Sequence, residues 1–132
     1  MKDANDVVAN LYVFGSCLRK ETPNDIDLLW VYDNNRFDTT QALEFVNQRT
    51  AVLQVLTDTP IHNTVLSSKE ETIVQFCVAS QACHLVSLET KSNTLSVMAR
   101  IDSLRKERGL KAISSASAEE VLLGEKKDDP FK

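Results

Sequence analysis

Cysteine is scarce in this chain of 132 residues, and basic residues do not outnumber acidic ones. Cys17, Cys77 and Cys83 are an odd number of cysteines without CxxC spacing, which argues against a disulfide framework and against a zinc site. The 15 basic and 19 acidic residues give a formal net charge of -4. Because phosphate contacts supply most of the affinity for nucleic acid, this balance argues against a stand-alone nucleic-acid-binding protein.

Long apolar runs and internal repeats are also missing. No apolar run reaches membrane-spanning length, and residues 1–4 do not begin like a signal peptide, so we expect a cytoplasmic protein that does not bind membranes. The hydrophobic content of 42% is ordinary for a globular protein, and the length fits one domain with a modest core. We expect this domain to span residues 1–112, followed by a partly flexible C-terminal extension, residues 113–132.

The most informative stretch is residues 11–32, LYVFGSCLRKETPNDIDLLWVY. A first apolar run ends at Gly15 and Ser16, and a second one carries Asp25 and Asp27, which predicts a strand, a tight turn, a short helix or loop, and a second strand. Successive side chains of a strand point to opposite faces. We therefore expect Asp25 and Asp27 to share one face while Ile26 points into the core.

Two carboxylates on one strand face repel each other, and a divalent cation offsets that repulsion. Hard oxygen ligands suit Mg²⁺, which would then bridge the phosphates of a nucleotide. Gly15 lets the backbone turn closely and expose N–H groups, and Ser16 adds a hydroxyl, so both are candidate phosphate-binding residues. The alternative interpretation is a chance Gly-Ser turn whose neighbouring acids, Asp25 and Asp27, only cap loops.

The motif Phe14-Gly15-Ser16, a spacer of residues 17–24 and then Asp25-Ile26-Asp27-Leu28 resembles the DNA polymerase beta-like nucleotidyltransferases, especially their small single-domain members, the minimal nucleotidyltransferases. The spacer is slightly shorter than is usual in that family. The resemblance covers about residues 5–90. It implies an α/β (α+β) fold in which helices pack on a small mixed β-sheet.

The same resemblance implies a reaction and its residues. The expected activity is Mg²⁺-dependent transfer of a nucleoside monophosphate from an NTP, with ATP the first choice, to a hydroxyl on a protein or a small molecule. Asp25 and Asp27 are the implied catalytic residues and metal ligands, and Gly15 and Ser16 would hold the nucleotide phosphates.

Family members commonly carry a third carboxylate on the third strand, which we expect at residues 61–66. The matching position here looks like His62. A neutral histidine accepts a proton near pH 7, yet its nitrogen is a poorer Mg²⁺ ligand than an oxygen. Two interpretations follow: His62 is a working catalytic substitute, or it is an ordinary strand histidine in a weakened or inactive site.

The absence of the third acid leaves a second function open, a catalytically silent nucleotide-binding or protein-interaction module that forms a homodimer. Small members of the family act beside a second protein, including antitoxins that modify or bind a partner toxin, so the resemblance also implies a protein partner or acceptor. Arg19 and Lys20 follow the Gly-Ser turn. They either reach the nucleotide phosphates or are exposed helix charges.

The remaining elements are predicted from periodicity and caps. A helix is expected over residues 40–56, capped by Asp38 or Thr39, with one apolar stripe that faces the sheet. Ser68 and Glu71 have the spacing of a capping box, and the helix that follows should bury one face. That face consists of Ile73, Val74, Phe76 and Cys77.

The ends of the chain are predicted in the same way. Residues 3–9 form either a brief helix or a lead into the first strand. A last strand is expected at residues 82–88, at an edge of the sheet. A helix over residues 93–108 ends at Gly109, with its arginines and lysines largely off the apolar face. These basic residues either favour the helix dipole or form a patch that binds a phosphate or a partner. A short helix is expected within residues 114–123.

Overall fold

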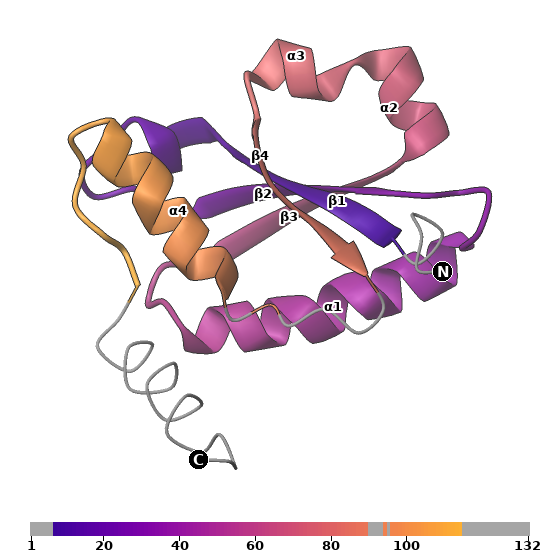
Figure 1. Cartoon of the computed structure of the whole chain (residues 1–132), viewed down its shortest axis with the longest axis horizontal. Helices are drawn as coiled ribbons and strands as arrows, with labels where there is room; N and C mark the ends of the chain where they lie inside the picture. The colour runs from indigo at the N-terminus through magenta and orange to yellow at the C-terminus, as the bar shows by residue number, and fades with distance from the viewer. Residues whose placement is uncertain (1–6, 90–93, 95, 115–132) are drawn as a thin grey trace, which may run out of the picture.

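A single four-stranded sheet with helices on both sides forms the core of the computed structural model, which describes residues 7–89, 94 and 96–114 (Figure 1). The elements in chain order are β1 (Val7–Phe14), the 3₁₀ helix η2 (Gly15–Leu18), β2 (Ile26–Tyr32), α1 (Thr39–Val55), β3 (Ile61–Ser67), α2 (Ser68–Val74), α3 (Phe76–Ser80), β4 (Cys83–Glu89) and α4 (Ser96–Glu107). This mixed sheet with packed helices confirms the expected α/β (α+β) class. Within the described part of the chain, no helix is both long and apolar enough to cross a membrane.

The strands lie in the order β3-β2-β1-β4. The central strand β1 is antiparallel to both β2 and β4, whereas β2 and β3 are parallel and are joined through α1. The strand β4 lies at an edge of the sheet, as predicted. In Figure 1 the strands separate α1 from the pair α2 and α3, which lie on the opposite side of the sheet.

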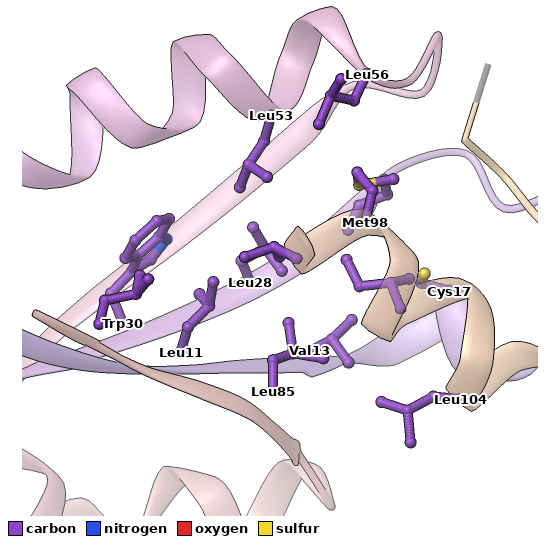
Figure 2. Close-up of a cluster of buried hydrophobic side chains, with 14 of the residues drawn as sticks. Leu11, Val13, Cys17, Leu28, Trp30, Leu53, Leu56, Leu85, Met98 and Leu104 are labelled. Carbon is purple, nitrogen blue, oxygen red and sulfur yellow. The ribbon is translucent and has the colours of Figure 1, made fainter. Parts of the chain in front are cut away.

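One main core lies between the sheet and the helices α1 and α4. The strands β1 and β2 contribute alternate side chains to it, among them Leu11 and Leu28, which are fully buried. Figure 2 shows Leu53 of α1 and Met98 of α4 among the side chains that surround them. The apolar stripes predicted for these two helices therefore face the sheet, as expected.

The caps of the long helices also follow the predictions. The side chain of Asp38 accepts a hydrogen bond from the N–H of Gln41 at the start of α1. Gly109 ends α4 with a φ of +77°, and the N–H of Leu110 returns to the carbonyl of Arg105 (2.9 Å). This arrangement closes the last helical turn in the way that a glycine in the left-handed region allows.

The predicted core face of the helix after β3 is wrong. Ile73, Val74 and Val78 are all more than half exposed. The helix is interrupted at Gln75, whose φ of 51° lies in the left-handed region, so α2 and α3 are two short helices rather than one. Phe76 packs edge-on against Phe14 (5.0 Å between ring centroids). A helical stripe requires a continuous helix, and the break at Gln75 removes that continuity.

The predicted capping box is wrong by one residue. Ser67, the last residue of β3, caps α2 together with Glu70. Ser68 instead donates its hydroxyl hydrogen bond to Asn34 (2.7 Å). Glu71 accepts from the backbone N–H groups of Phe76 and Cys77. Tertiary contacts of β3 and of the loop after β2 therefore decided where the helix begins.

The two ends of the chain are only partly described. Residues 7–9 belong to β1, so the brief helix considered for residues 3–9 is wrong in that part. Residues 3–6 and the helix expected after residue 114 lie outside the described residues. Of the expected C-terminal extension, Ile113 packs against the core and Ser114 pairs with Thr57 in an isolated β-bridge.

Candidate metal and nucleotide site

The end of β1 and the beginnings of β2 and β3 bring the predicted site residues together. Phe14, the last residue of β1, pairs with Asp27 in β2, and Asp27 pairs in turn with His62 in β3. Asp25 directly precedes β2, and Ile26 between the two acids is fully buried. The prediction that the two carboxylates share a face while Ile26 enters the core is confirmed.

Asp25, Asp27 and His62 form a compact cluster in which one ligand atom of each residue lies within 4.8 Å of the others. The Nδ1 atom of His62 is 3.2 Å from Oδ2 of Asp25 and 4.0 Å from Oδ1 of Asp27. The imidazole is 65% exposed, whereas the two carboxylates are 25% and 27% exposed. The cluster is thus open to solvent on the histidine side.

The electrostatics of Asp27 reflect this crowding. Burial raises the pKa of the Asp27 carboxyl above its ordinary value, and the neighbouring Asp25 raises this pKa further. His62 and Arg19 act in the opposite direction and lower the pKa of Asp27. A cation bound between the carboxylates would relieve the repulsion that raises this pKa.

Gly15 lies directly against the cluster. Its φ of +81° favours glycine, and a Cβ atom built at this position would lie 2.5 Å from Oδ2 of Asp27. Any larger side chain would therefore push on the Asp27 carboxylate. The donor set of two carboxylates and one imidazole, held against a glycine and open on one side, fits a divalent cation.

The other three predicted phosphate-binding residues, Ser16, Arg19 and Lys20, differ in where their side chains and backbone groups lie. Ser16 accepts backbone hydrogen bonds from Arg19 and Lys20 through its carbonyl oxygen, which closes the turn after β1. Arg19 lines a hollow of about 180 Å³ beside Gly15. The side chain of Lys20 is exposed and does not line that hollow. The structure thus brings Gly15 and Arg19 to one surface.

Arg108 also lines this hollow, together with Leu18, Ser80 and Gln81. The basic residues near the end of α4 were predicted either to favour the helix dipole or to bind a phosphate or a partner. Two guanidinium groups beside Gly15 favour an anion in the hollow. Helical periodicity could not assign Arg108 to this position, because the hollow joins three segments that are distant in the sequence.

Arg105 is a residue whose role the sequence did not reveal. It is fully buried in α4, although the sequence predicted that the basic residues of this helix lie largely off its apolar face. Its Nη1 donates to the carbonyls of Cys17 (2.6 Å) and Lys20 (3.0 Å), its Nη2 to that of Glu21 (2.9 Å) and its Nε to that of Lys111 (2.7 Å). Arg105 therefore holds the loop between the glycine turn and the acids of β2.

No family model, curated protein or solved structure matches this chain. The resemblance to nucleotidyltransferases, carried by Gly15, Ser16, Asp25 and Asp27, therefore stays a prediction.

Proposed function

We propose that this protein is a nucleotidyltransferase-like enzyme that transfers a nucleoside monophosphate from an NTP, with ATP the first choice, to a hydroxyl of a protein or a small molecule. The observation that carries the proposal is the cluster of Asp25, Asp27 and His62 beside the Gly15 turn. Carboxylates that converge on one point next to a glycine turn suit a metal-bound polyphosphate.

Each residue of the site has a defined part in the proposal. Asp25 and Asp27 would hold the divalent cation, which when bound supplies charge neutralisation and orientation at the phosphates. The backbone around Gly15 and Ser16 would approach the phosphate oxygens, and Arg19 would add positive charge in the neighbouring hollow. In this class of reaction most of the rate comes from positioning and from electrostatic stabilisation.

The size of the hollow indicates which part of a nucleotide it would take. Its volume of about 180 Å³ is smaller than the roughly 300 to 1,000 Å³ typical of pockets that enclose a whole ligand. Its two arginines, Arg19 and Arg108, suit phosphate groups. The base and the acceptor would bind over the adjoining surface, and the acceptor would complete the site.

We propose that the protein acts in the cytoplasm, together with a protein partner or acceptor or with a second copy of the chain. A cytoplasmic protein has access to ATP, and the three cysteines are free thiols, as is usual in a reducing compartment. A protein partner or acceptor, or a second copy of the chain, would find exposed apolar side chains on α2 and α3. These are Ile73, Val74 and Val78.

A second candidate function follows from His62. This residue occupies the strand position beside Asp27, where the resembled family commonly has a third carboxylate. A site with two carboxylates would retain nucleotide binding without transfer, as a regulatory or antitoxin-like module. Nucleotide binding without release of pyrophosphate would favour this candidate.

Calorimetric titration of ATP and of a non-hydrolysable analogue, with and without a divalent cation, tests the proposal. We expect binding that depends on the cation and is lost in the Asp25→Asn/Asp27→Asn double variant. The Glu44→Gln variant is the control for lost charge, because Glu44 is exposed on α1 and does not belong to the cluster.

Pyrophosphate release measured with the same proteins separates the two candidates. Release by the wild type that disappears in the double variant would support the transferase. Cation-dependent binding without release in the presence of candidate acceptors would support the silent module. Absence of nucleotide binding in the wild type, with either Mg²⁺ or Mn²⁺ present, would overturn both.

A further inference from the structure

We propose that the cluster of Asp25, Asp27 and His62 selects a first-row transition-metal dication over Mg²⁺, with Nδ1 of His62 as the third protein ligand. This inference rests on the metal site of the proposed function and concerns which metal it takes. The resembled family implies Mg²⁺ held by carboxylates, so the histidine gives this chain a donor set of its own.

The backbone positions the imidazole independently of any ligand. His62 is paired with Asp27 in the parallel register of β2 and β3, and this pairing begins with the N–H of Ile26 donating to the carbonyl of Pro60 (2.8 Å). Neighbouring parallel strands lie about 4.8 Å apart. A histidine in this register therefore stays within reach of the Asp27 carboxylate.

The two distances from Nδ1 of His62 to the carboxylates agree with coordination of one ion. Transition-metal bonds to nitrogen and oxygen are about 2.1 Å long, so two ligand atoms on one ion cannot be more than about 4.2 Å apart. The two distances from His62 Nδ1, 3.2 Å to Asp25 and 4.0 Å to Asp27, both satisfy this limit.

The ligand types decide between metals. Mg²⁺ favours an octahedral shell of oxygen atoms and keeps several of its waters, whereas imidazole nitrogen suits softer ions such as Zn²⁺, Fe²⁺ or Ni²⁺. Mn²⁺ and Co²⁺ accept the same mixture of carboxylate and imidazole. Exposure of 65% of the His62 side chain leaves the side opposite the sheet for water or phosphate oxygen.

The chain offers a matched control in its second histidine. His84 lies in β4, where its Nε2 is 3.1 Å from Oδ1 of Asn10 and its ring packs edge-on against Tyr12 (5.2 Å between centroids). His84 does not belong to the cluster with Asp25 and Asp27. Its replacement removes one imidazole from the same sheet without touching the proposed ligands.

The test uses MnCl₂ as the probe and the full chain at pH 7.5. Electron paramagnetic resonance measures Mn²⁺ affinity, competition with MgCl₂ measures the preference, and electron spin echo envelope modulation detects a coordinated ¹⁴N nucleus. Wild type, His62→Ala, His62→Asp and His84→Ala are compared, and circular dichroism verifies that each variant is folded.

We expect Mn²⁺ to bind the wild type at least about tenfold more tightly than Mg²⁺, with ¹⁴N modulation. His62→Ala should lose the modulation and weaken Mn²⁺ binding by about 10- to 100-fold, while His84→Ala should change neither. His62→Asp should lose the modulation and bring the two affinities closer together, because it supplies a third oxygen ligand.

Mn²⁺ bound without ¹⁴N modulation, with equal affinity for Mg²⁺ and no effect of His62→Ala, would overturn the inference. So would a wild type that binds no Mn²⁺. Titration of ATP in the presence of each metal keeps this outcome apart from the fate of the proposed function. Nucleotide binding that depends on Asp25 and Asp27 but not on His62 leaves the proposed function standing, whereas histidine-dependent Mn²⁺ binding without nucleotide binding leaves only the inference.

Discussion

Two charged sites lie beside the loop between β1 and β2, and they are built in opposite ways. Arg105 is fully buried and donates hydrogen bonds to four backbone carbonyls. Asp25, Asp27 and His62 are partly exposed and bring their ligand atoms toward one another. Removal of a buried, hydrogen-bonded charge leaves its partners unsatisfied and destabilises the fold, whereas like charges held together at the surface cost stability and suit a bound ion.

We expect the largest change in stability from a substitution of Arg105. Arg105→Met leaves carbonyls of the loop without their donor, among them the buried carbonyl of Cys17, so we expect the free energy of unfolding to fall by about 1 to 3 kcal/mol. Urea unfolding followed by circular dichroism measures the loss. Arg100→Met in the exposed part of the same helix is the matched control and should change stability by less than about 0.5 kcal/mol. Equal stability of the two variants would show that the buried guanidinium does not hold the loop.

Gly15 provides a test at the open cluster. A Cβ at Gly15 meets the Asp27 carboxylate, whereas a Cβ at Gly109, where φ is also positive, meets no atom within 4 Å. We expect Gly15→Ala and Gly109→Ala each to lose about 1 to 2 kcal/mol of stability through backbone strain. Gly15→Ala alone should also weaken Mn²⁺ binding by about 10- to 100-fold.

Thermal unfolding and Mn²⁺ titration of both glycine variants separate the two effects. If Gly15→Ala bound the ion as tightly as Gly109→Ala does, the position of the Asp27 carboxylate against Gly15 would not matter for the site. If both variants lost affinity, the effect would be one of general stability.

Cys17 provides a second test of the buried region around Arg105. It is fully buried, and burial raises the pKa of its thiol from 9.0 to about 11, although Arg105 lowers that pKa. A shift from 9.0 to about 11 reduces the thiolate fraction about 100-fold at pH 8. Cys17 should therefore react with a disulfide reagent at least about 100-fold more slowly in the folded protein than in urea.

Peptide mapping by mass spectrometry identifies which thiol has reacted. Cys83, which is half-buried, serves as the internal comparison and should be labelled earlier. Labelling of Cys17 at the same rate in folded and unfolded protein would contradict the prediction. In Arg105→Met the protection of Cys17 should decrease, because the loop that contains it loses its anchor.

The smallest expected effect is at Asp27, where removal of the charge should raise the stability of the folded state instead of lowering it. Burial and Asp25 raise the pKa of Asp27 above 3.8, so the folded state holds this proton more tightly than the unfolded state. Ionisation of Asp27 therefore costs stability as the pH rises from 3.8 through the folded-state pKa, and the full cost is present at neutral pH. Asp27→Asn removes this cost, so we expect a higher Tm than wild type at pH 7 without added metal.

Thermal melts between pH 7 and pH 4 check this sign. The difference in Tm between Asp27→Asn and wild type should shrink as the pH falls, and Glu44→Gln should show no such trend. Added Mn²⁺ should raise the Tm of the wild type and leave that of Asp27→Asn unchanged. A lower Tm for Asp27→Asn at pH 7 would mean that Asp27 supports the fold in the same manner as Arg105.

The parts of the fold that the sequence predicted are those governed by local periodicity. The alternation around Ile26 placed both acids on one face, and the stripes of α1 and α4 were continuous over 17 and 12 residues. In α2 and α3 the apolar residues belong to helices of only 7 and 5 residues, separated at Gln75. Short segments carry too few turns for a pattern to determine which side is buried.

The sequence predicted which residues form the candidate site but not how they are arranged in space. Gly15, Asp25, Asp27 and His62 were all selected from the sequence, and the structure brings them together. The hydrogen bonds from Arg105 to the loop carbonyls were not predicted, because a guanidinium that binds distant carbonyls leaves no periodic signal in the sequence. Basic residues near a helix end are ordinarily explained by the helix dipole, and that explanation concealed this one.

The sequence by itself determined that a glycine turn is followed by two carboxylates on one face of a strand, because side-chain alternation and glycine conformation depend only on neighbouring residues. Only the tertiary structure decided that His62 Nδ1 lies 3.2 Å from Asp25, since this follows from the parallel pairing of β2 with β3 after a helical crossover. It also decided that Arg105 is buried, because the carbonyls that bind it belong to a loop 84 or more residues away and to Lys111, which follows α4.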